Sequence, residues 1–177
     1  YPLRRQRQMC IRDRFGLVDY YLTADEAEHR LLKHLGPEPL TDAFDAAYLY
    51  DALCKRSTAI KPTLMDAKVV VGVGNIYANE ALFRSKIHPT KPANKLTKKQ
   101  VGVLVPEIKT VLQEAIVAGG SSLRDFQHTD GKLGYFQFNF LVYGREGEPC
   151  RVCGTPIQKI TLAQRSTFFC PNCQRKR

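Results

Sequence analysis

Four cysteines near the C-terminus form two C-x2-C pairs separated by sixteen residues: Cys150, Cys153, Cys170 and Cys173. Each pair can sit on a tight turn that aims two thiolates at one tetrahedral ion. The stretch between the pairs has the length of a two-stranded ribbon that brings them together. Two disulfides are the alternative, which a reducing compartment disfavours. The spacing therefore predicts one structural Zn2+ held by the four cysteines.

The segment between the pairs, residues 157–169, alternates in strand fashion and predicts a β-hairpin with Gln164 and Arg165 near its turn. A rigid, zinc-pinned hairpin could carry the Arg165 guanidinium into a groove or onto a phosphate. A solvated surface arginine is the alternative, and spacing alone does not decide between them. The other two cysteines have no partner at ligand spacing, so we expect Cys10 in a leader and Cys54 buried or half-buried on a helix.

The charge balance favours a polyanionic partner. Lys and Arg number 27 against 17 Asp and Glu, which gives a net charge of +10 and a pI near 9.4. Nucleic acid and an anionic membrane surface both fit such a balance. No apolar run approaches the roughly 20 residues of a membrane-spanning helix, and no hydrophobic signal segment follows the first residues. We therefore expect a cytoplasmic chain with no membrane partner.

Residues 1–14 carry a local charge surplus of +4, from five arginines and one aspartate. The segment has neither helical nor strand periodicity, so it should not pack into a core. It is either a basic nucleic-acid arm or a foreign leader on a truncated chain, and we favour truncation. The segment at 15–22 is rich in β-formers and suits the last strand of a β-rich N-terminal domain that is otherwise missing.

Periodicity and end signals predict a mainly α-helical middle. We expect helices at 24–35, 42–53, 63–68 and from Ile76, and the clearest at 98–118. Thr97 and Gln100 form a capping box for this last helix, and Pro106 should kink it or mark a later start. Its apolar face should be core: Val101, Leu104, Val105, Ile108, Val111, Leu112, Ala115 and Ile116.

The segment GVGN (72–75) has the ingredients of an anion site. Its glycines allow close backbone approach, and the following helix N-terminus offers unpaired N–H groups to a phosphate. The spacing is that of neither a dinucleotide-binding fold nor a P-loop, so mononucleotide binding is disfavoured. Asn75 could cap the helix, bind a phosphate, or do both.

Several long motifs together resemble bacterial formamidopyrimidine-DNA glycosylase. The similarity runs from about Phe15 to the C-terminus. Its motifs are LGPEPL (35–40), AIKP (59–62), LMDAKVVVGVGNIYANEALF (64–83), IHP (87–89), GGSSLRDF (119–126), DGKLGYF (130–136) and YGREGEPCRVCGTPI (143–157).

The resemblance implies a helix-two-turn-helix DNA-binding domain at 24–142 and a zinc finger at 143–177, after the strand remnant at 15–23. It also implies base-excision repair: removal of oxidised purines such as 8-oxoguanine and formamidopyrimidines, then strand cleavage by AP lyase chemistry. The expected partner is double-stranded DNA with oxidised bases or abasic sites, bound by a monomer.

The resemblance assigns roles to individual residues. By this resemblance, Asn75 holds a phosphate beside the lesion. Arg165 binds the same region of the DNA and has a catalytic role in the second elimination step. Tyr135 belongs to the loop that closes over the everted base, and Phe15 is a wedge for the vacated space. Three further residues fall at or near positions associated with DNA contact: Lys55, Arg56 and Lys61.

The catalytic start of the family has no counterpart in this sequence. The family's nucleophile is the free amine of an N-terminal proline followed by a glutamate, whereas Pro2 is acylated by Tyr1 and followed by Leu3. We therefore expect the chain to bind damaged DNA without turnover. A non-catalytic DNA-binding module and an endonuclease VIII-type glycosylase are the alternatives, and GGSSLRDF and DGKLGYF argue against the second.

Overall fold

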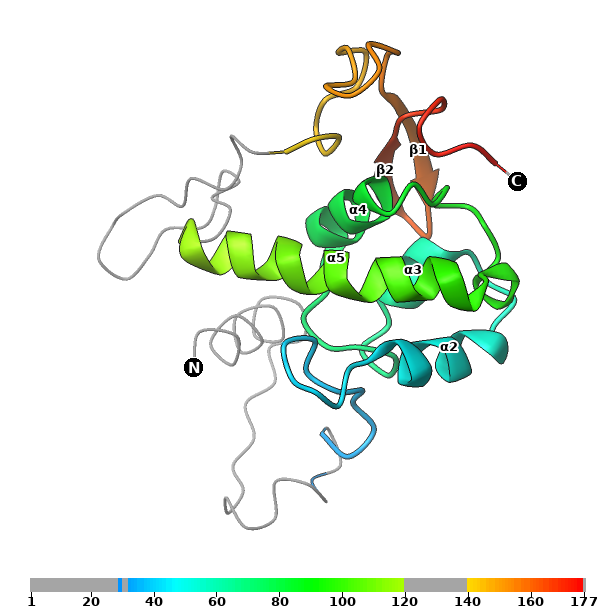
Figure 1. Cartoon of the computed structure of the whole chain (residues 1–177), viewed down its shortest axis with the longest axis vertical. Coiled ribbons are helices and arrows are strands. Elements are labelled where there is room, and N and C mark those ends of the chain that lie inside the picture. The colour runs from blue at the N-terminus through cyan, green and yellow to red at the C-terminus, as the bar shows by residue number, and fades with distance from the viewer. Residues whose placement is uncertain (1–28, 30–31, 120–139, 177) are drawn as a thin grey trace.

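A computed structural model describes residue 29 and residues 32–119 and 140–176. Its elements are α2 (Ala46–Cys54), α3 (Ile60–Leu64), α4 (Asn75–Arg84), the 3-10 helix η2 (Ala93–Lys95), α5 (Lys98–Val117), β1 (Gln158–Leu162) and β2 (Arg165–Phe169). In Figure 1 the helices form one body and the hairpin rises above α4. The leader, the expected strand remnant with Phe15, and the loop with Tyr135 lie outside the described residues.

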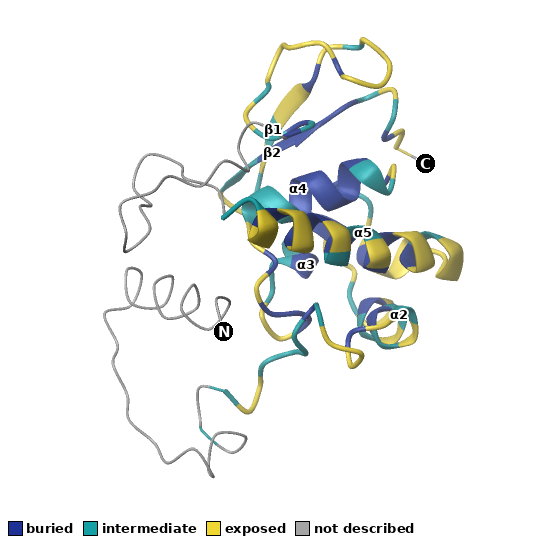
Figure 2. Cartoon of the chain, turned by 60° about the vertical axis from the view of Figure 1, so that its left-hand side comes forward, coloured by how far each residue is buried: buried dark blue, intermediate teal, exposed yellow. Residues whose placement is uncertain are grey.

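Helix α5 organises the helical body. Thr97 Oγ1 accepts the Gln100 N–H at 3.2 Å and Gln100 Oε1 accepts the Thr97 N–H at 3.2 Å, which confirms the capping box. Helices α2 and α4 pack on α5, and Figure 2 shows α4 mostly buried while α5 keeps an exposed outer face. The predicted apolar face is buried except for Ile116, which is exposed near the end of the helix.

Three other sequence expectations need correction. The helix predicted at 42–53 begins at Ala46, because Asp45 is its N-cap and accepts the Tyr48 N–H at 2.7 Å. The helix predicted at 63–68 lies earlier, at Ile60–Leu64. Cys54 is exposed rather than buried, because it ends α2 on the solvent side.

Pro106 does not mark a later start for α5. The helix begins at Lys98 and runs through Pro106 to Val117. Proline costs a helix one backbone hydrogen bond and crowds the carbonyl four residues earlier, here that of Gly102. Pro106 is exposed, so that carbonyl faces the solvent side of the helix.

Two turns join α3 to α4 and fix the start of α4. In the first, the Val69 N–H donates to Asp66 O at 2.8 Å. Asp66 also accepts Arg56 Nη1 at 2.7 Å and the Lys68 N–H at 2.9 Å. The second turn uses Gly72 at φ 79° and leads into Gly74, the N-cap of α4. This helix, two-turn, helix arrangement confirms the helical architecture expected from the sequence.

The chain at Gly36 and Pro37 packs against these turns through two backbone hydrogen bonds. The Gly36 N–H donates to Ala67 O at 2.7 Å, and the Val71 N–H donates to Pro37 O at 3.2 Å. A Cβ at Gly36 would lie 2.5 Å from Val69 O and 2.9 Å from Val70 N. Because these are backbone atoms of the turn, a larger residue would have to push the turn aside.

We therefore expect Gly36→Ala to destabilise the fold by about 1–3 kcal/mol, the usual cost of overpacking. Gly102→Ala is the matched control, since a Cβ there meets nothing within 4 Å. It should be neutral or stabilising by about 0.5–1 kcal/mol, because alanine favours helix. Urea unfolding of the two variants measures both changes, and equal stabilities would contradict the close approach at Gly36.

Candidate nucleic-acid interface and zinc centre

The four predicted cysteines converge at one point. Their Sγ atoms all lie within 4.8 Å of one another, with Cys150–Cys173 at 3.9 Å and Cys153–Cys170 at 3.5 Å. Thiolates tetrahedral about a zinc ion at 2.3 Å stand about 3.8 Å apart, whereas a disulfide needs about 2.05 Å. The spacing therefore fits one structural zinc and excludes the disulfide alternative for these four residues.

Local turns present the sulfur atoms. The Val152 N–H donates to Cys150 Sγ at 3.5 Å and the Cys173 N–H to Cys170 Sγ at 3.4 Å. Hydrogen bonds from Thr155 and Asn172 lower the pKa of Cys153 to about 5, so this ligand is a thiolate at neutral pH. Burial raises the pKa of Cys170 and of Cys173. Zinc supplies the positive charge that holds such buried thiols deprotonated.

The hairpin beside the zinc centre has the predicted turn. Strands β1 and β2 pair antiparallel, with Leu162 opposite Arg165. Ala163 and Gln164 both have positive φ, 47° and 59°, as a two-residue type I′ turn requires. Arg165 is thus the first residue after the turn, and its side chain is half-buried.

Polar side chains of the helical body, of which Lys61 and Asn79 are buried, hold β2 in place; we call this contact the hairpin junction. Lys61 Nζ donates to Ser166 O at 2.9 Å and to Thr167 Oγ1 at 2.6 Å. Asn75 Nδ2 donates to Ser166 O at 3.2 Å, and the Phe168 N–H donates to Asn79 Oδ1 at 2.8 Å. The junction places the start of β2 beside the N-terminus of α4.

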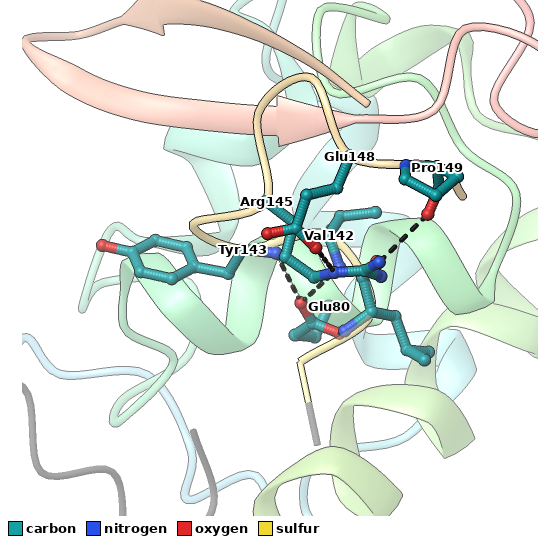
Figure 3. A network of polar contacts seen from close by, with 7 residues as sticks. Glu80, Val142, Tyr143, Arg145, Glu148 and Pro149 are labelled. Carbon is teal, nitrogen blue, oxygen red and sulfur yellow. Dashed lines mark hydrogen bonds and ion pairs between the residues drawn. The ribbon is translucent and has the colours of Figure 1, made fainter. Parts of the chain in front are cut away.

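Two further buried groups attach the finger to the helices. Glu80 accepts the N–H groups of Leu141, Val142 and Tyr143 at 2.9, 3.0 and 2.8 Å, as Figure 3 shows in part. Gln174 Nε2 donates to Ile87 O at 2.8 Å, while its Oε1 accepts the Cys170 N–H at 3.0 Å. Because both side chains are buried and satisfied, loss of either would leave unpaired backbone groups.

Arg165 and Lys61 bring two positive charges together. Burial, reinforced by the neighbouring Arg165 guanidinium, lowers the pKa of Lys61 to about 8. Among the described residues, no carboxylate forms an ion pair with either side chain; the pairs present are Arg56–Asp66, Arg84–Glu114, Arg145–Glu148 and Lys159–Glu146. The N-terminal pole of α4 adds further positive potential beside them.

Asn75 is only partly satisfied at this position. Its Oδ1 is buried and has no hydrogen-bond partner among the described residues, and its amide contact to Ser166 is long. Gly74 beside it is exposed, and a Cβ built there would meet nothing within 4 Å, so the protein leaves open space next to the start of α4. Because an amide oxygen only accepts, the donors open to an anion such as a phosphate are the Asn75 Nδ2 group and the N–H groups at the start of α4.

Two of the other residues predicted to contact DNA, Lys55 and Arg56, do not join Asn75 and Arg165. Arg56 is held by Asp66, and the pKa of Asp66 is lowered, against the effect of burial, by its hydrogen bonds from Lys68 and Arg56. Lys55 is exposed at the end of α2. Lys61 is 1% exposed and bound to the hairpin. The structure thus brings Asn75, Lys61 and Arg165 together and leaves Lys55 and Arg56 outside that group.

Sequence reasoning missed Asn79, Glu80 and Gln174. A sequence clue exists for the first two, because both are polar residues among the apolar positions of α4. Nothing in the sequence pattern pairs Glu80 with the distant residues 141–143.

No helix in the described ranges has the length and apolar character needed to cross a membrane.

Together, the helix-two-turn-helix body and the four-cysteine hairpin packed on it define a protein of the helix-two-turn-helix and zinc-finger class. The family described as formamidopyrimidine-DNA glycosylase H2TH domain matches residues 35–127. The zinc finger found in FPG and IleRS matches residues 147–175. The chain belongs to the formamidopyrimidine-DNA glycosylase family, which confirms the resemblance.

Relatives agree with this assignment. The formamidopyrimidine-DNA glycosylase of Saccharophagus degradans is 56% identical over 164 residues, covering 92% of this chain and 59% of the relative. That of Serratia proteamaculans is 58% identical over 151 residues, 85% of this chain and 56% of the relative. The chain therefore spans less than two thirds of the length of these relatives.

Solved structures of the family share the fold. MutM (Fpg) from Thermus thermophilus superposes with a TM-score of 0.80 at 43% identity, covering 86% of this chain and 58% of that protein. The Lactococcus lactis Fpg in complex with DNA containing an abasic site gives 0.80 at 42% identity, covering 87% of this chain and 56% of that protein.

We expect the buried Lys61 of the hairpin junction to make the free energy of unfolding depend on pH. Lys61 loses its proton near pH 8 in the folded chain but only near pH 10.4 when unfolded. Between these values the unfolded state binds more protons, so the free energy of unfolding should rise with pH. Relative to Lys61→Met, the wild-type chain should gain about 1 kcal/mol or more across this window.

Urea unfolding at several pH values measures the difference, with exposed Lys159→Met as the control for removing an ammonium group. Parallel pH profiles for wild type and Lys61→Met would contradict a strained, buried ammonium at the junction.

Proposed function

We propose that the chain binds double-stranded DNA at oxidised bases or abasic sites, as one copy, and serves base-excision repair. The proposal rests on the cluster formed by Arg165, Lys61 and the N-terminus of α4. Within the described residues, no carboxylate forms an ion pair with either cation. Two like charges held together cost free energy, and a phosphate between them would remove that cost.

The zinc hairpin supplies the rigidity that such a contact needs. Phosphate contacts set the register of a protein on a duplex, and extruding a damaged nucleotide costs a few kcal/mol. A guanidinium fixed at the start of β2 and an amide fixed at the start of α4 can hold the distorted backbone. Their binding free energy would offset the cost of extrusion.

The names of the relatives support the glycosylase part of the proposed chemistry. As a member of the glycosylase family, the chain would take part in removing oxidised purines such as 8-oxoguanine and formamidopyrimidines, followed by strand cleavage by AP lyase chemistry. In that reaction we assign Arg165 to the second elimination and Asn75 to the phosphate beside the lesion. Phe15 would fill the vacated space and Tyr135 would belong to the loop over the everted base.

We further propose that the 177-residue polypeptide binds without turnover. Its Pro2 nitrogen is acylated by Tyr1, and an amide nitrogen does not form the imine that this chemistry requires. The alternative of a non-catalytic DNA-binding module makes the same binding prediction. Borohydride trapping on an 8-oxoguanine duplex tests turnover: we expect no covalent adduct, and an adduct would disprove this part of the proposal.

We expect Asn75→Ala and Arg165→Ala each to weaken binding to an abasic-site duplex about tenfold or more, which is about 1.4 kcal/mol. If both side chains hold the same phosphate region, the double variant should lose less than the product of the two effects. Fluorescence anisotropy titration at fixed salt measures the affinities.

Lys159→Ala is the matched control, because it removes one charge from the same hairpin at an exposed position on β1. It should change affinity by much less than Arg165→Ala. Equal losses for Lys159→Ala and Arg165→Ala would mean that only net charge matters and would contradict a built phosphate site.

A further inference from the structure

Four exposed lysines gather at the end of the helical body where α2 ends and α5 begins; we call them the lysine strip. They are Lys55, Lys95, Lys98 and Lys99. The Asn94 N–H donates to Arg56 O at 2.9 Å, which joins η2 to the end of α2. Lys98 Nζ lies 5.4 Å from the centre of the Tyr50 ring on α2. These contacts bring the segments that carry the four lysines together at this end of the helical body.

Within the described residues, no member of the lysine strip forms an ion pair. Asp51, the acidic residue of α2 that follows Tyr50, is exposed, and it is not among the ion-paired carboxylates of the described chain. The neighbouring acid Asp66 is occupied by Arg56. The four lysines thus keep a net positive charge even when the single charge of Asp51 is counted against them.

Apart from the contact between Lys98 and the Tyr50 ring, no interaction within the described residues favours positive charge at the start of α5. Lys98 and Lys99 occupy the first turn of α5, which contains no acidic residue. That end of a helix is positive, so cations there are unfavourable and acids are the stabilising choice. A local arrangement that opposes stability is better explained by an anionic partner outside the chain.

The lysine strip continues from the anion site. The Ile60 N–H donates to Lys91 O at 2.8 Å and the Lys61 N–H to Pro89 O at 3.3 Å, so segment 89–91 lies along the start of α3. Lys61 itself contacts the hairpin. From the hairpin, α3 and this segment lead directly to η2 and α5, as the right-hand side of Figure 1 shows.

We propose that the lysine strip binds the phosphodiester backbone of duplex DNA flanking the lesion, beyond the phosphates held at the anion site. Duplex DNA presents one charge per about 1.7 Å of axis, and a row of lysines can neutralise several phosphates without reading sequence. The proposal rests on the DNA binding proposed above, and it adds a second, separate contact surface.

The test compares a short duplex of about 10 base pairs with one of about 25, each with a central abasic site. The variant Lys95→Gln/Lys98→Gln/Lys99→Gln should bind the long duplex about tenfold or more weakly than wild type. Its slope of log affinity against log salt should fall by about 2–3, because each phosphate that is no longer neutralised removes about 0.9 from the slope. On the short duplex it should match wild type.

The control removes the same charge elsewhere, through Lys86→Gln/Lys109→Gln/Lys159→Gln, and should change neither the long-duplex affinity nor the salt slope by as much. No change in the strip variant, as expected if the strip docks an acidic protein instead, would overturn the proposal. Equal losses on both duplexes would overturn it too. If wild type bound neither duplex, the proposed DNA binding itself would have failed.

Discussion

The site depends on the buried contact between Lys61 and the hairpin. One ammonium group, 1% exposed, donates to a backbone carbonyl and a hydroxyl of β2. Removing a buried cation from water is costly, and here the lowered pKa records that cost. The same contact fixes where β2 starts, and therefore where Arg165 lies relative to Asn75. A destabilising feature thus sets the geometry of the anion site.

Both zinc and the helical body stabilise the position of the zinc finger. The metal ties the two cysteine turns together, while Glu80, Asn79 and Gln174 bind backbone groups of the finger and its connection. The finger also has a small apolar core of its own, to which α4 contributes Phe83. The hairpin is therefore supported at its base by metal and along β2 by helices.

Much of this could be predicted from the sequence, for physical reasons. Four cysteines at fixed spacing admit few geometries, so the zinc centre and the hairpin followed from them. Helix α5 was predictable because its capping box and apolar period agree. Asn75 at a glycine-rich helix start predicts an anion site from local rules alone, and that site stays a prediction.

The rest depends on contacts between residues far apart in the chain. Lys61 and Thr167 are 106 positions apart, and no periodic pattern pairs them. The resemblance assigns Lys61 to DNA contact, whereas the structure shows its ammonium bound to the hairpin. The expected burial of Cys54 and Ile116 is wrong because helical periodicity does not say where the covering elements stop.

Hydrogen exchange before and after zinc removal tests whether a zinc-pinned hairpin bound to the helices forms the DNA site. Without zinc, the amides of Phe168 and Cys170, which bond to Asn79 and Gln174, should lose protection, whereas Val111 in α5 should keep it. Affinity for abasic-site DNA should fall in parallel. Full protection at Phe168 and unchanged affinity in the zinc-free chain would contradict the account.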